Sequence, residues 1–511
     1  MTVLQEAIDQ SLSREAKRIA LYHGEQAYRI GELKDQSLKM AAGLIQQGLE
    51  VGDRVGFMLP NCPEALITTL ASYNQGLVIV PINYRFQAND ASKFIDQVEP
   101  KLLVYHVDKE PVVTELKQRY SEIKYFCVGD QSAVETEHSP AFETLPGNDL
   151  LEAASGIPED HPALILFTSG STGIPKGVVH SQRTVFEAFD SARQIFDFNE
   201  EDVVLVGKSI SHAGGLQTQL FPAFAAGSQI VLATNPSPAE AVAIIQRHKV
   251  TEYAMLASNF LDFVEFMEAH HEGLPSLRKC IASGDAVPHD LHERFKKLFG
   301  WEALEGCGMT EVGTYYSVNP LYGKRKWGSI GLPAPNMQVR VVQSDDKTAA
   351  VNETGELMVK SPTNTIGYWN NPEATKRLFS DGWLHTGDLG YADEDGYFWF
   401  VSRKKLLIVR RGSNISPVEI ENVLDEHPLI HATVVVGVPD DRDGEVPVAC
   451  IASMEDTNRP VESELREFVA PQLAAYKLPK HYLFLSELPQ TATGKFDRHE
   501  LEEMAGEAFA K

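Results

Sequence analysis

Apolar residues along the chain follow two different spacings, which predict that helices and strands alternate. Within residues 31–50 the apolar positions recur every three or four residues, the spacing of one helix face. These positions are Leu38, Ala41, Ile45 and Leu49. Gly52 and Asp53 follow, and this pair favours the end of the helix.

The residues after this helix predict a parallel sheet. Residues 53–59 and 77–82 are apolar runs typical of strands, and residues 63–76 between them predict a helix. The same alternation recurs over residues 229–255, with a helix expected over 238–248. Strand–helix–strand alternation favours a parallel sheet covered by helices.

The last third of the chain changes character twice. Residues 323–402 contain short apolar runs between turns, which predict a β-rich subdomain. Ser416, Pro417 and Glu419 then match a capping box with proline at the first helical position, which predicts a helix start. We therefore expect an α/β protein with a large N-terminal domain of helix-covered sheets, the β-rich subdomain, and a small C-terminal α/β domain.

Composition and charge narrow the class of protein. The chain has 511 residues and a net charge of −25, which disfavours nucleic acid and anionic membrane surfaces as partners. Its five cysteines form no C-x-x-C pair, so neither a disulfide framework nor a zinc site is expected. The N-terminus lacks an apolar signal core, and no apolar run approaches membrane-spanning length. These features predict a soluble, cytoplasmic protein.

The stretch FTSGSTGIPKG, Phe167 to Gly177, carries the strongest chemical signal. Its glycines allow backbone N–H groups to converge on an anion, and its hydroxyl groups and Lys176 add further donors. It is not a Walker P-loop, because Lys176 is followed by glycine and then by a predicted strand. The alternatives are a phosphate-binding loop on a hairpin and an ordinary Gly/Ser turn.

Four further clusters follow this loop in the sequence. They are Glu305–Glu311 (EGCGMTE), His385–Leu389 (HTGDL), residues 402–417 (SRKK followed by RGSNISP) and Leu488–Lys495 (LPQTATGK). Together with the loop, and in this order, they resemble the ANL superfamily of adenylate-forming enzymes. Length and motifs look most like an AMP-forming acyl-CoA synthetase.

The resemblance implies a nucleotide site spread over the whole chain. Its expected ATP/AMP-binding residues are Thr168, Ser169, Gly170, Ser171, Thr172, Gly173, Lys176, Gly284, Asp285, Ala286, Glu305, Gly306, Cys307, Gly308, Met309, Thr310, Asp388, Arg403 and Lys495. Mg²⁺ is expected at Thr168 and Glu311. Taken alone, Glu311 could be a solvated or helix-capping glutamate, Asp388 a turn residue, and Arg403 part of a solvated basic run.

The resemblance also implies catalytic and mobile parts. Its catalytic residues would be Lys495, Thr310, Glu311, His212 and Lys176, with Lys495 stabilising the charge that develops during AMP transfer. Lys405 would be the hinge within residues 403–405, between an AMP-binding domain (1–402) and a mobile domain (406–511). Arg411 and Gly412 would contact coenzyme A, although Arg411 could also be a plain surface arginine.

The resemblance places the acyl pocket at His212, Gly214, Gly215, Gly306 and Met309. Gly306 is expected to leave room for a chain or ring, which favours a medium-chain or aromatic carboxylate. For a polar substrate, the nearest countercharge is Lys208. Three positions depart from the family pattern. Cys307 replaces a tyrosine that stacks on adenine, Ser402 replaces Gly or Asp, and the pair Arg410 and Arg411 replaces part of a Gly-rich loop.

The resulting hypothesis is an AMP-forming acyl-CoA ligase that uses ATP, Mg²⁺ and coenzyme A. The alternative is an acyl-AMP ligase that delivers the acyl group to a carrier protein. A nucleotide-binding protein without activity is a third possibility. The expected partners are a small carboxylic acid, ATP and coenzyme A, with no nucleic acid and no integral membrane segment, in a monomer or homodimer.

Overall fold

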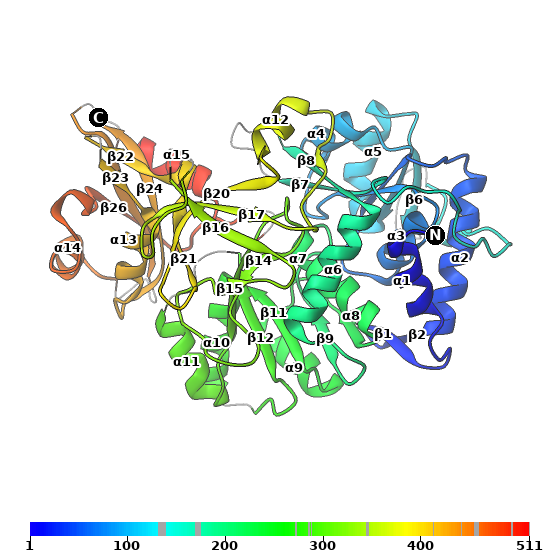
Figure 1. Ribbon diagram of the computed structural model, residues 1–511, viewed down its shortest axis with the longest axis horizontal. Coiled ribbons are helices and arrows are strands. Elements are labelled where there is room, and N and C mark those ends of the chain that lie inside the picture. Colours follow the sequence, from blue (N-terminus) through cyan, green and yellow to red (C-terminus); the bar gives the residue numbers. More distant parts are fainter. Residues whose placement is uncertain are drawn as a thin grey trace.

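A computed structural model of the chain describes residues 1–511 except for a few short segments. The segments left out are 131–138, 169–174, 271–272, 285–286, 288, 344–346, 412, 441, 454–458, 492–493 and 510–511. The N-terminal part forms the larger body, and the C-terminal part forms a smaller unit at its left end in Figure 1.

The first sheet has seven strands, and parallel pairing joins β7, β4, β3, β5 and β6. Its order is β18 (Gly367–Tyr368), β8 (Lys176–Ser181), β7 (Pro162–Thr168), β4 (Val78–Pro81), β3 (Arg54–Met58), β5 (Leu102–His106) and β6 (Lys124–Val128). Its helices are α2 (Ile30–Gln46), α3 (Pro63–Asn74), α4 (Ala88–Val98) and α5 (Glu110–Arg119). The predicted strand–helix–strand unit over residues 53–82 is confirmed.

The second sheet has nine strands. Its order is β15 (Leu332–Pro333), β14 (Tyr315–Val318), β13 (Leu304–Gly308), β12 (Lys279–Ser283), β11 (Glu252–Leu256), β9 (Val203–Val206), β10 (Gln229–Leu232), β1 (Ile19–His23) and β2 (Gln26–Arg29). Its helices are α1 (Val3–Leu12), α6 (Gln182–Phe196), α7 (Ala213–Gly215), a π-helical stretch (Leu216–Leu220), α8 (Phe221–Ala226), α9 (Pro238–His248), α10 (Ala257–His270) and α11 (His289–Phe299). Helix α9 has the predicted bounds.

Alternating side chains of the strands face different buried cores, of which three are large. The largest lies between the two sheets and contains residues of α1, α2, α3 and α6. In β9, Val204 and Val206 belong to this core, whereas Leu205 belongs to a second core with α9, α10 and α11. A third core joins the far side of the seven-stranded sheet to α4 and α5. Helices therefore cover both sheets on both faces, as the apolar runs predict.

The β-rich subdomain forms a small sheet of its own. Its elements are β16 (Gln338–Val342), β17 (Gly355–Lys360), β19 (Phe379–Ser380), β20 (Trp383–Ala392), β21 (Phe398–Arg403) and α12 (Pro372–Leu378). The predicted range 323–402 is too wide, because β15 pairs with β14 and so completes the nine-stranded sheet. In Figure 1 this subdomain lies between the N-terminal body and the C-terminal unit.

The C-terminal unit is a five-stranded sheet with three α-helices. It contains β22 (Ile408–Arg410), β23 (Ser413–Ile415), β24 (Ile430–Asp440), β25 (Gly444–Ser453), β26 (His481–Leu485), α13 (Pro417–Asp425), α14 (Glu462–Val469) and α15 (Arg498–Phe509). It has two apolar cores of its own. These support the prediction of a separate α/β domain.

Two local predictions need correction. Helix α2 ends at Gln46 rather than near residue 50, because Gly48 takes a left-handed conformation (φ 80°) that ends the helix earlier. Helix α13 begins at Pro417 as expected, but the capping box is absent. The Ser416 hydroxyl donates instead to the carbonyl of Val401 at 2.6 Å, which ties the helix start to β21.

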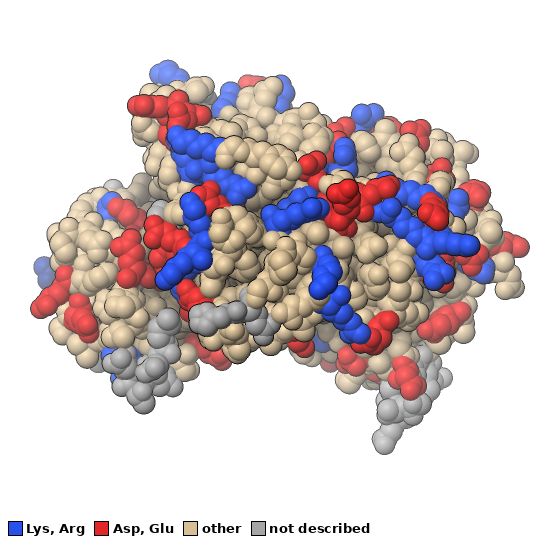
Figure 2. All heavy atoms as spheres, turned by 90° about the horizontal axis from the view of Figure 1, so that it is seen from below, with Lys and Arg blue, Asp and Glu red and all other residues tan. Residues whose placement is uncertain are grey.

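On the face shown in Figure 2, Lys and Arg side chains are interspersed with Asp and Glu side chains. Along the described residues, no helix combines the length and the apolar character needed to cross a membrane.

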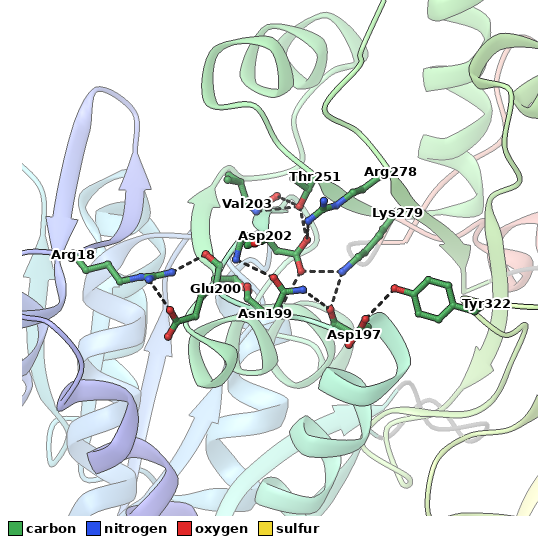
Figure 3. A network of polar contacts seen from close by, with 12 residues as sticks. Arg18, Asp197, Asn199, Glu200, Asp202, Val203, Thr251, Arg278, Lys279 and Tyr322 are labelled. Carbon is green, nitrogen blue, oxygen red and sulfur yellow. Dashed lines mark hydrogen bonds and ion pairs between the residues drawn. The ribbon is translucent and has the colours of Figure 1, made fainter.

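A buried ion-pair network lies at the start of β9 and β12 (Figure 3). Asp202 has no exposed surface; Lys279 Nζ donates to its Oδ2 at 2.8 Å and Arg278 to its Oδ1 at 2.9 Å. Burial alone would raise the pKa of Asp202, but the bonds from Lys279 and Arg278 outweigh it and lower the pKa. The network joins the loop before β9 to the strand that carries Ser283.

Replacing Asp202 by asparagine is expected to destabilise the fold by about 3–5 kcal/mol, because it leaves the buried Lys279 ammonium without its counter-ion. Urea unfolding measures this loss. The matched control is Glu200→Gln, since Glu200 is 59% exposed and its pairing with Arg18 should contribute at most about 1 kcal/mol. Equal stability of Asp202→Asn and the wild type would contradict the role assigned to this network.

Candidate active site

The Gly/Ser-rich stretch lies on a β-hairpin, as predicted. Strands β7 and β8 pair antiparallel, and Thr168 lies opposite Lys176 where the strands meet the loop. Lys176 Nζ lies 5.1 Å from the centre of the Tyr368 ring. Five predicted phosphate contacts fall in the loop itself and lie outside the described residues: Ser169, Gly170, Ser171, Thr172 and Gly173.

Glu311 is a buried carboxylate beside this hairpin. Its side chain accepts a hydrogen bond from the Tyr368 hydroxyl at 2.8 Å, and its backbone carbonyl accepts from the Thr365 amide at 2.7 Å. Burial raises the pKa of Glu311, and Arg403 and Lys176 act against that rise. A cation in front of the carboxylate would restore its charge.

This environment fits the Mg²⁺ that the sequence predicts. Mg²⁺ is usually held by one or two carboxylates while it keeps waters and phosphate oxygens, so a single buried glutamate suffices. Among the described residues no cluster of three or more His, Cys, Asp or Glu side chains could hold a metal ion without such help. Of the two predicted Mg²⁺ ligands, Glu311 is buried and Thr168 is the last residue of β7.

Asp388 is the second buried carboxylate of the site. It lies on β20 opposite Arg403 of β21, and Arg403 Nε is 3.3 Å from its Oδ1. The Tyr316 hydroxyl donates to Oδ2 at 2.9 Å and lies 3.0 Å from the Cys307 sulfur. Burial raises the pKa of Asp388, and Arg403 opposes the rise. Asp388 and Arg403, distant in the sequence from Cys307, are thus brought together with it.

Tyr316 is a site residue that the motifs do not indicate. It is fully buried on β14, in contact with both Cys307 and Asp388. Burial raises the pKa of the Cys307 thiol to about 12, so this residue stays a neutral thiol. The only signal in the sequence is that YYSV, Tyr315–Val318, forms the apolar strand following the Glu305–Glu311 cluster.

Lys495 comes from the C-terminal unit and reaches the N-terminal body. A Cβ placed on Gly284 would lie 3.5 Å from Lys495 Cε and 4.0 Å from Nζ, so the lysine passes directly over this glycine. The Ser258 hydroxyl donates to the carbonyl of Gly494 at 3.2 Å. Lys495 acts electrostatically on Asp388. The two units are therefore docked with Lys495 in the site.

Cations lie beside both buried carboxylates of the site, Glu311 and Asp388. Lys176 and Arg403 act on Glu311, and Arg403 and Lys495 act on Asp388. Their convergence from β8, β21 and the segment before α15 creates a site suited to a polyphosphate. Of the neighbouring predicted residues, Asp285 and Ala286 lie outside the described part of the chain.

His212 precedes α7 and faces Asn83. The amide Nδ2 of Asn83 donates to His212 Nε2 at 3.2 Å, which places the imidazole proton on Nδ1. Burial, with the charges of Lys495 and Arg85, lowers the pKa of His212 to about 4. The ring is therefore neutral at neutral pH. It can orient a ligand by hydrogen bonding but adds no charge.

Residues of the Glu305–Glu311 cluster are held by hydrogen bonds to two different histidines. The Thr310 carbonyl accepts from His180 Nε2 at 2.8 Å, which holds the turn after β13, and Glu305 accepts from His292 at 3.1 Å. Met309 packs at the margin of the largest core. A Cβ on Gly308 would lie 2.6 Å from the Thr314 carbonyl oxygen, so glycine allows β14 to approach here.

The room expected at Gly306 is not available to a ligand. A Cβ there would lie 3.0 Å from Val318 and 3.1 Å from both the Ser317 carbonyl and the Tyr315 ring. The protein itself fills this space, so the expectation that Gly306 admits a chain or ring is wrong. Gly214 is more open, since a Cβ there would meet only Lys208 Cδ, at 3.5 Å.

Two further predicted residues lie after β21, one in the predicted hinge and one in the C-terminal unit. Lys405 is exposed in the 3₁₀ turn Lys404–Leu406, between β21 and the C-terminal unit. Arg411 takes a left-handed conformation (φ 50°), and its guanidinium pairs with Asp443 at 2.6 Å, as Arg410 does at 2.9 Å. Gly412, its predicted neighbour at coenzyme A, lies outside the described residues.

The docked arrangement is expected to weaken as pH rises. His431 of β24 lies 3.5 Å from Glu265 of α10, with Asp262 and Arg294 nearby. The hydrogen bond to Glu265 raises the pKa of His431, so this contribution is present below its ordinary pKa and disappears above the raised one. The docked fraction, measured by fluorescence energy transfer between the units, should fall several-fold from pH 6 to 8. His431→Gln should abolish this pH dependence. If the variant kept the pH profile of the wild type, the role assigned to His431 would be contradicted.

Two family models match the chain along most of its length. The AMP-binding enzyme family matches residues 8–369, and the AMP-binding enzyme C-terminal domain matches residues 419–495. Together they cover the hairpin, the Glu305–Glu311 cluster and Lys495. Asp388 and Arg403 lie between the two matched ranges.

Known proteins agree with these matches. A long-chain-fatty-acid–CoA ligase of Bacillus subtilis (strain 168) is 31% identical over 98% of this chain and 94% of its own. A fatty acid–[acyl-carrier-protein] ligase, ScoC, of Streptomyces coeruleorubidus is 30% identical over 92% of this chain and 90% of its own. The crystal structure of ATP-bound MatB from Rhodopseudomonas palustris has a TM-score of 0.90 at 25% identity, covering 99% of both chains. The chain therefore belongs to the AMP-binding enzyme family, within the ANL superfamily of adenylate-forming enzymes.

Proposed function

We propose that this enzyme is an AMP-forming acyl-CoA ligase that activates a small carboxylic acid. The observation that carries the proposal is the position of Lys495, which passes over Gly284 and acts on Asp388 from a separate folding unit. A lysine delivered in this way can act in one half-reaction and withdraw for the next.

In the first half-reaction a carboxylate oxygen attacks the α-phosphorus of ATP, and the bond to pyrophosphate breaks. Lys495 and Thr310 would stabilise the negative charge on the α-phosphate oxygens, and Lys176 the departing pyrophosphate. Mg²⁺, held by Glu311 and Thr168, would supply further charge neutralisation. Neutral His212 would orient the acid without adding charge.

Asp388 and Arg403 are proposed to hold the ribose. Asp388 carries two acceptor oxygens, and Tyr316 and Arg403 fix its orientation. Positioning of this kind turns a reaction between separate molecules into one within a complex, which is a large part of catalysis by such sites.

In the second half-reaction the residues 406–511 would rotate about Lys405, and Lys495 would leave the site. The thiolate of coenzyme A then attacks the acyl carbon, and the bond to AMP breaks. Arg411 is proposed to contact coenzyme A phosphates, in exchange for Asp443. A carrier protein as acceptor is the alternative, and the 30% identity to a carrier-protein ligase keeps it open.

Two assays test this proposal in sequence. Exchange of labelled pyrophosphate into ATP, measured with a panel of carboxylic acids, should occur only when an acid is present. No pyrophosphate exchange with any acid would refute the ligase function. Thioester formation with coenzyme A, compared with a phosphopantetheinylated carrier protein, then separates the two acceptors; transfer to the carrier alone would overturn the coenzyme A assignment.

A further inference from the structure

Lys208 lies at the same end of the nine-stranded sheet as the proposed reaction centre. It follows β9 by two residues, while Ser283 is the last residue of β12. Strands β9, β11, β12 and β13 are parallel, so their carboxyl ends meet along one edge. In open α/β sheets this edge is where ligands bind.

The ammonium group of Lys208 is held by two hydroxyl groups. It donates to Ser283 Oγ at 3.2 Å and to Tyr315 Oη at 3.3 Å, and these two oxygens are 3.0 Å apart. Ser283 and Tyr315 are both buried, so the ammonium lies against a wall of neutral oxygens. Among the described residues Lys208 forms no ion pair.

The carboxyl group of Glu252, which acts on Lys208 from deeper in the sheet, does not neutralise it. Glu252 has no exposed surface, and burial raises its pKa to about 8, so it is protonated at neutral pH. Its Oε2 accepts from Gln219 at 3.4 Å. A half-buried ammonium without a nearby carboxylate is costly, and a ligand anion would relieve that cost.

Lys208 and Lys495 both lie close to the segments 283–284 and 212–214. Gly284, over which Lys495 passes, directly follows Ser283 in the chain. The stem of Lys208 lies against Gly214, two residues after His212. An acid with its reacting carboxylate at His212 and Lys495 would therefore extend its other end toward Lys208.

We propose that the enzyme activates acids with a second negatively charged group, and that Lys208, Ser283 and Tyr315 bind that group. The ligand class is a dicarboxylic acid, aliphatic or aromatic, which becomes a monothioester. This inference rests on the proposed ligase function and specifies its substrate. The Tyr315 ring, whose hydroxyl accepts from Lys208, also fills the space beside Gly306, 3.1 Å from a Cβ placed there.

Pyrophosphate exchange with matched acids tests the inference. The pairs are succinate and butyrate, adipate and hexanoate, and terephthalate and benzoate. For the best pair, kcat/KM should favour the diacid by about 100-fold or more, because a site built for a polar group rejects an analogue lacking it. Exchange with monoacids alone would overturn the inference while leaving the ligase intact. No exchange with any acid would overturn both.

Three variants separate recognition from folding. Lys208→Met should lower kcat/KM for the diacid by about 100-fold and leave the monoacid unchanged or improved. Lys208→Arg should retain the preference, and Tyr315→Phe should weaken it by about tenfold through one lost hydrogen bond. A parallel loss on diacid and monoacid in Lys208→Met would assign Lys208 a structural role and refute the proposal.

Discussion

Alanine at position 495 is expected to slow acyl-adenylate formation by about 10³-fold, with little change in the second half-reaction. Lys495 is the cation that the C-terminal unit delivers over Gly284. Removing a preorganised charge from the transition state usually costs about 10²–10³ in rate. Single-turnover formation of pyrophosphate measures the first step, and thioester formation from a supplied acyl-adenylate measures the second.

Lys404→Ala is the matched control for this variant. Lys404 is also a lysine close to the site, but it is 67% exposed and pairs with Glu356 at 3.5 Å. Its loss should leave both half-reactions near the wild-type rate. If Lys495→Ala slowed the two half-reactions equally, Lys495 would be a structural residue and not the cation of the first step.

Glutamine in place of Glu311 is expected to reduce adenylation by about 100-fold and to raise the Mg²⁺ concentration needed for half-maximal rate. The substitution keeps the size of the side chain and an oxygen for the Tyr368 bond, but removes the charge that would face the metal ion. A titration of Mg²⁺ at saturating ATP measures both effects.

The control here is Tyr368→Phe. It removes the hydroxyl that donates to Glu311 at 2.8 Å and keeps the ring beneath Lys176. A loss of about tenfold or less is expected, because one hydrogen bond is removed while the carboxylate stays. An unchanged Mg²⁺ dependence in Glu311→Gln would show that this carboxylate is not a metal ligand.

Local patterns in the sequence were sufficient for much of the fold. The hairpin that carries Thr168 and Lys176, the strands around α3 and the bounds of α9 all follow from spacing and from glycine or proline at the ends. These features depend on neighbouring residues, which the sequence displays directly. The family resemblance itself is confirmed by the family models.

Contacts between distant segments could not be predicted in the same way. Tyr316 reaches Asp388 only because β14 folds back beside β13, and Tyr368 reaches Glu311 because β18 pairs with β8. Ser416 has the right residue type for a cap, but Val401 offers it another acceptor. The same limit explains the error at Gly306, since a glycine does not reveal what occupies the space beside it.

The transfer of an oxygen atom tests the central claim most directly. If the acid attacks the α-phosphorus of ATP, one carboxylate oxygen remains with AMP when the thioester forms. An acid labelled with ¹⁸O, incubated with enzyme, MgATP and coenzyme A, should give AMP containing one ¹⁸O atom by mass spectrometry. Unlabelled AMP, or label in inorganic phosphate with release of ADP, would contradict the adenylate-forming account.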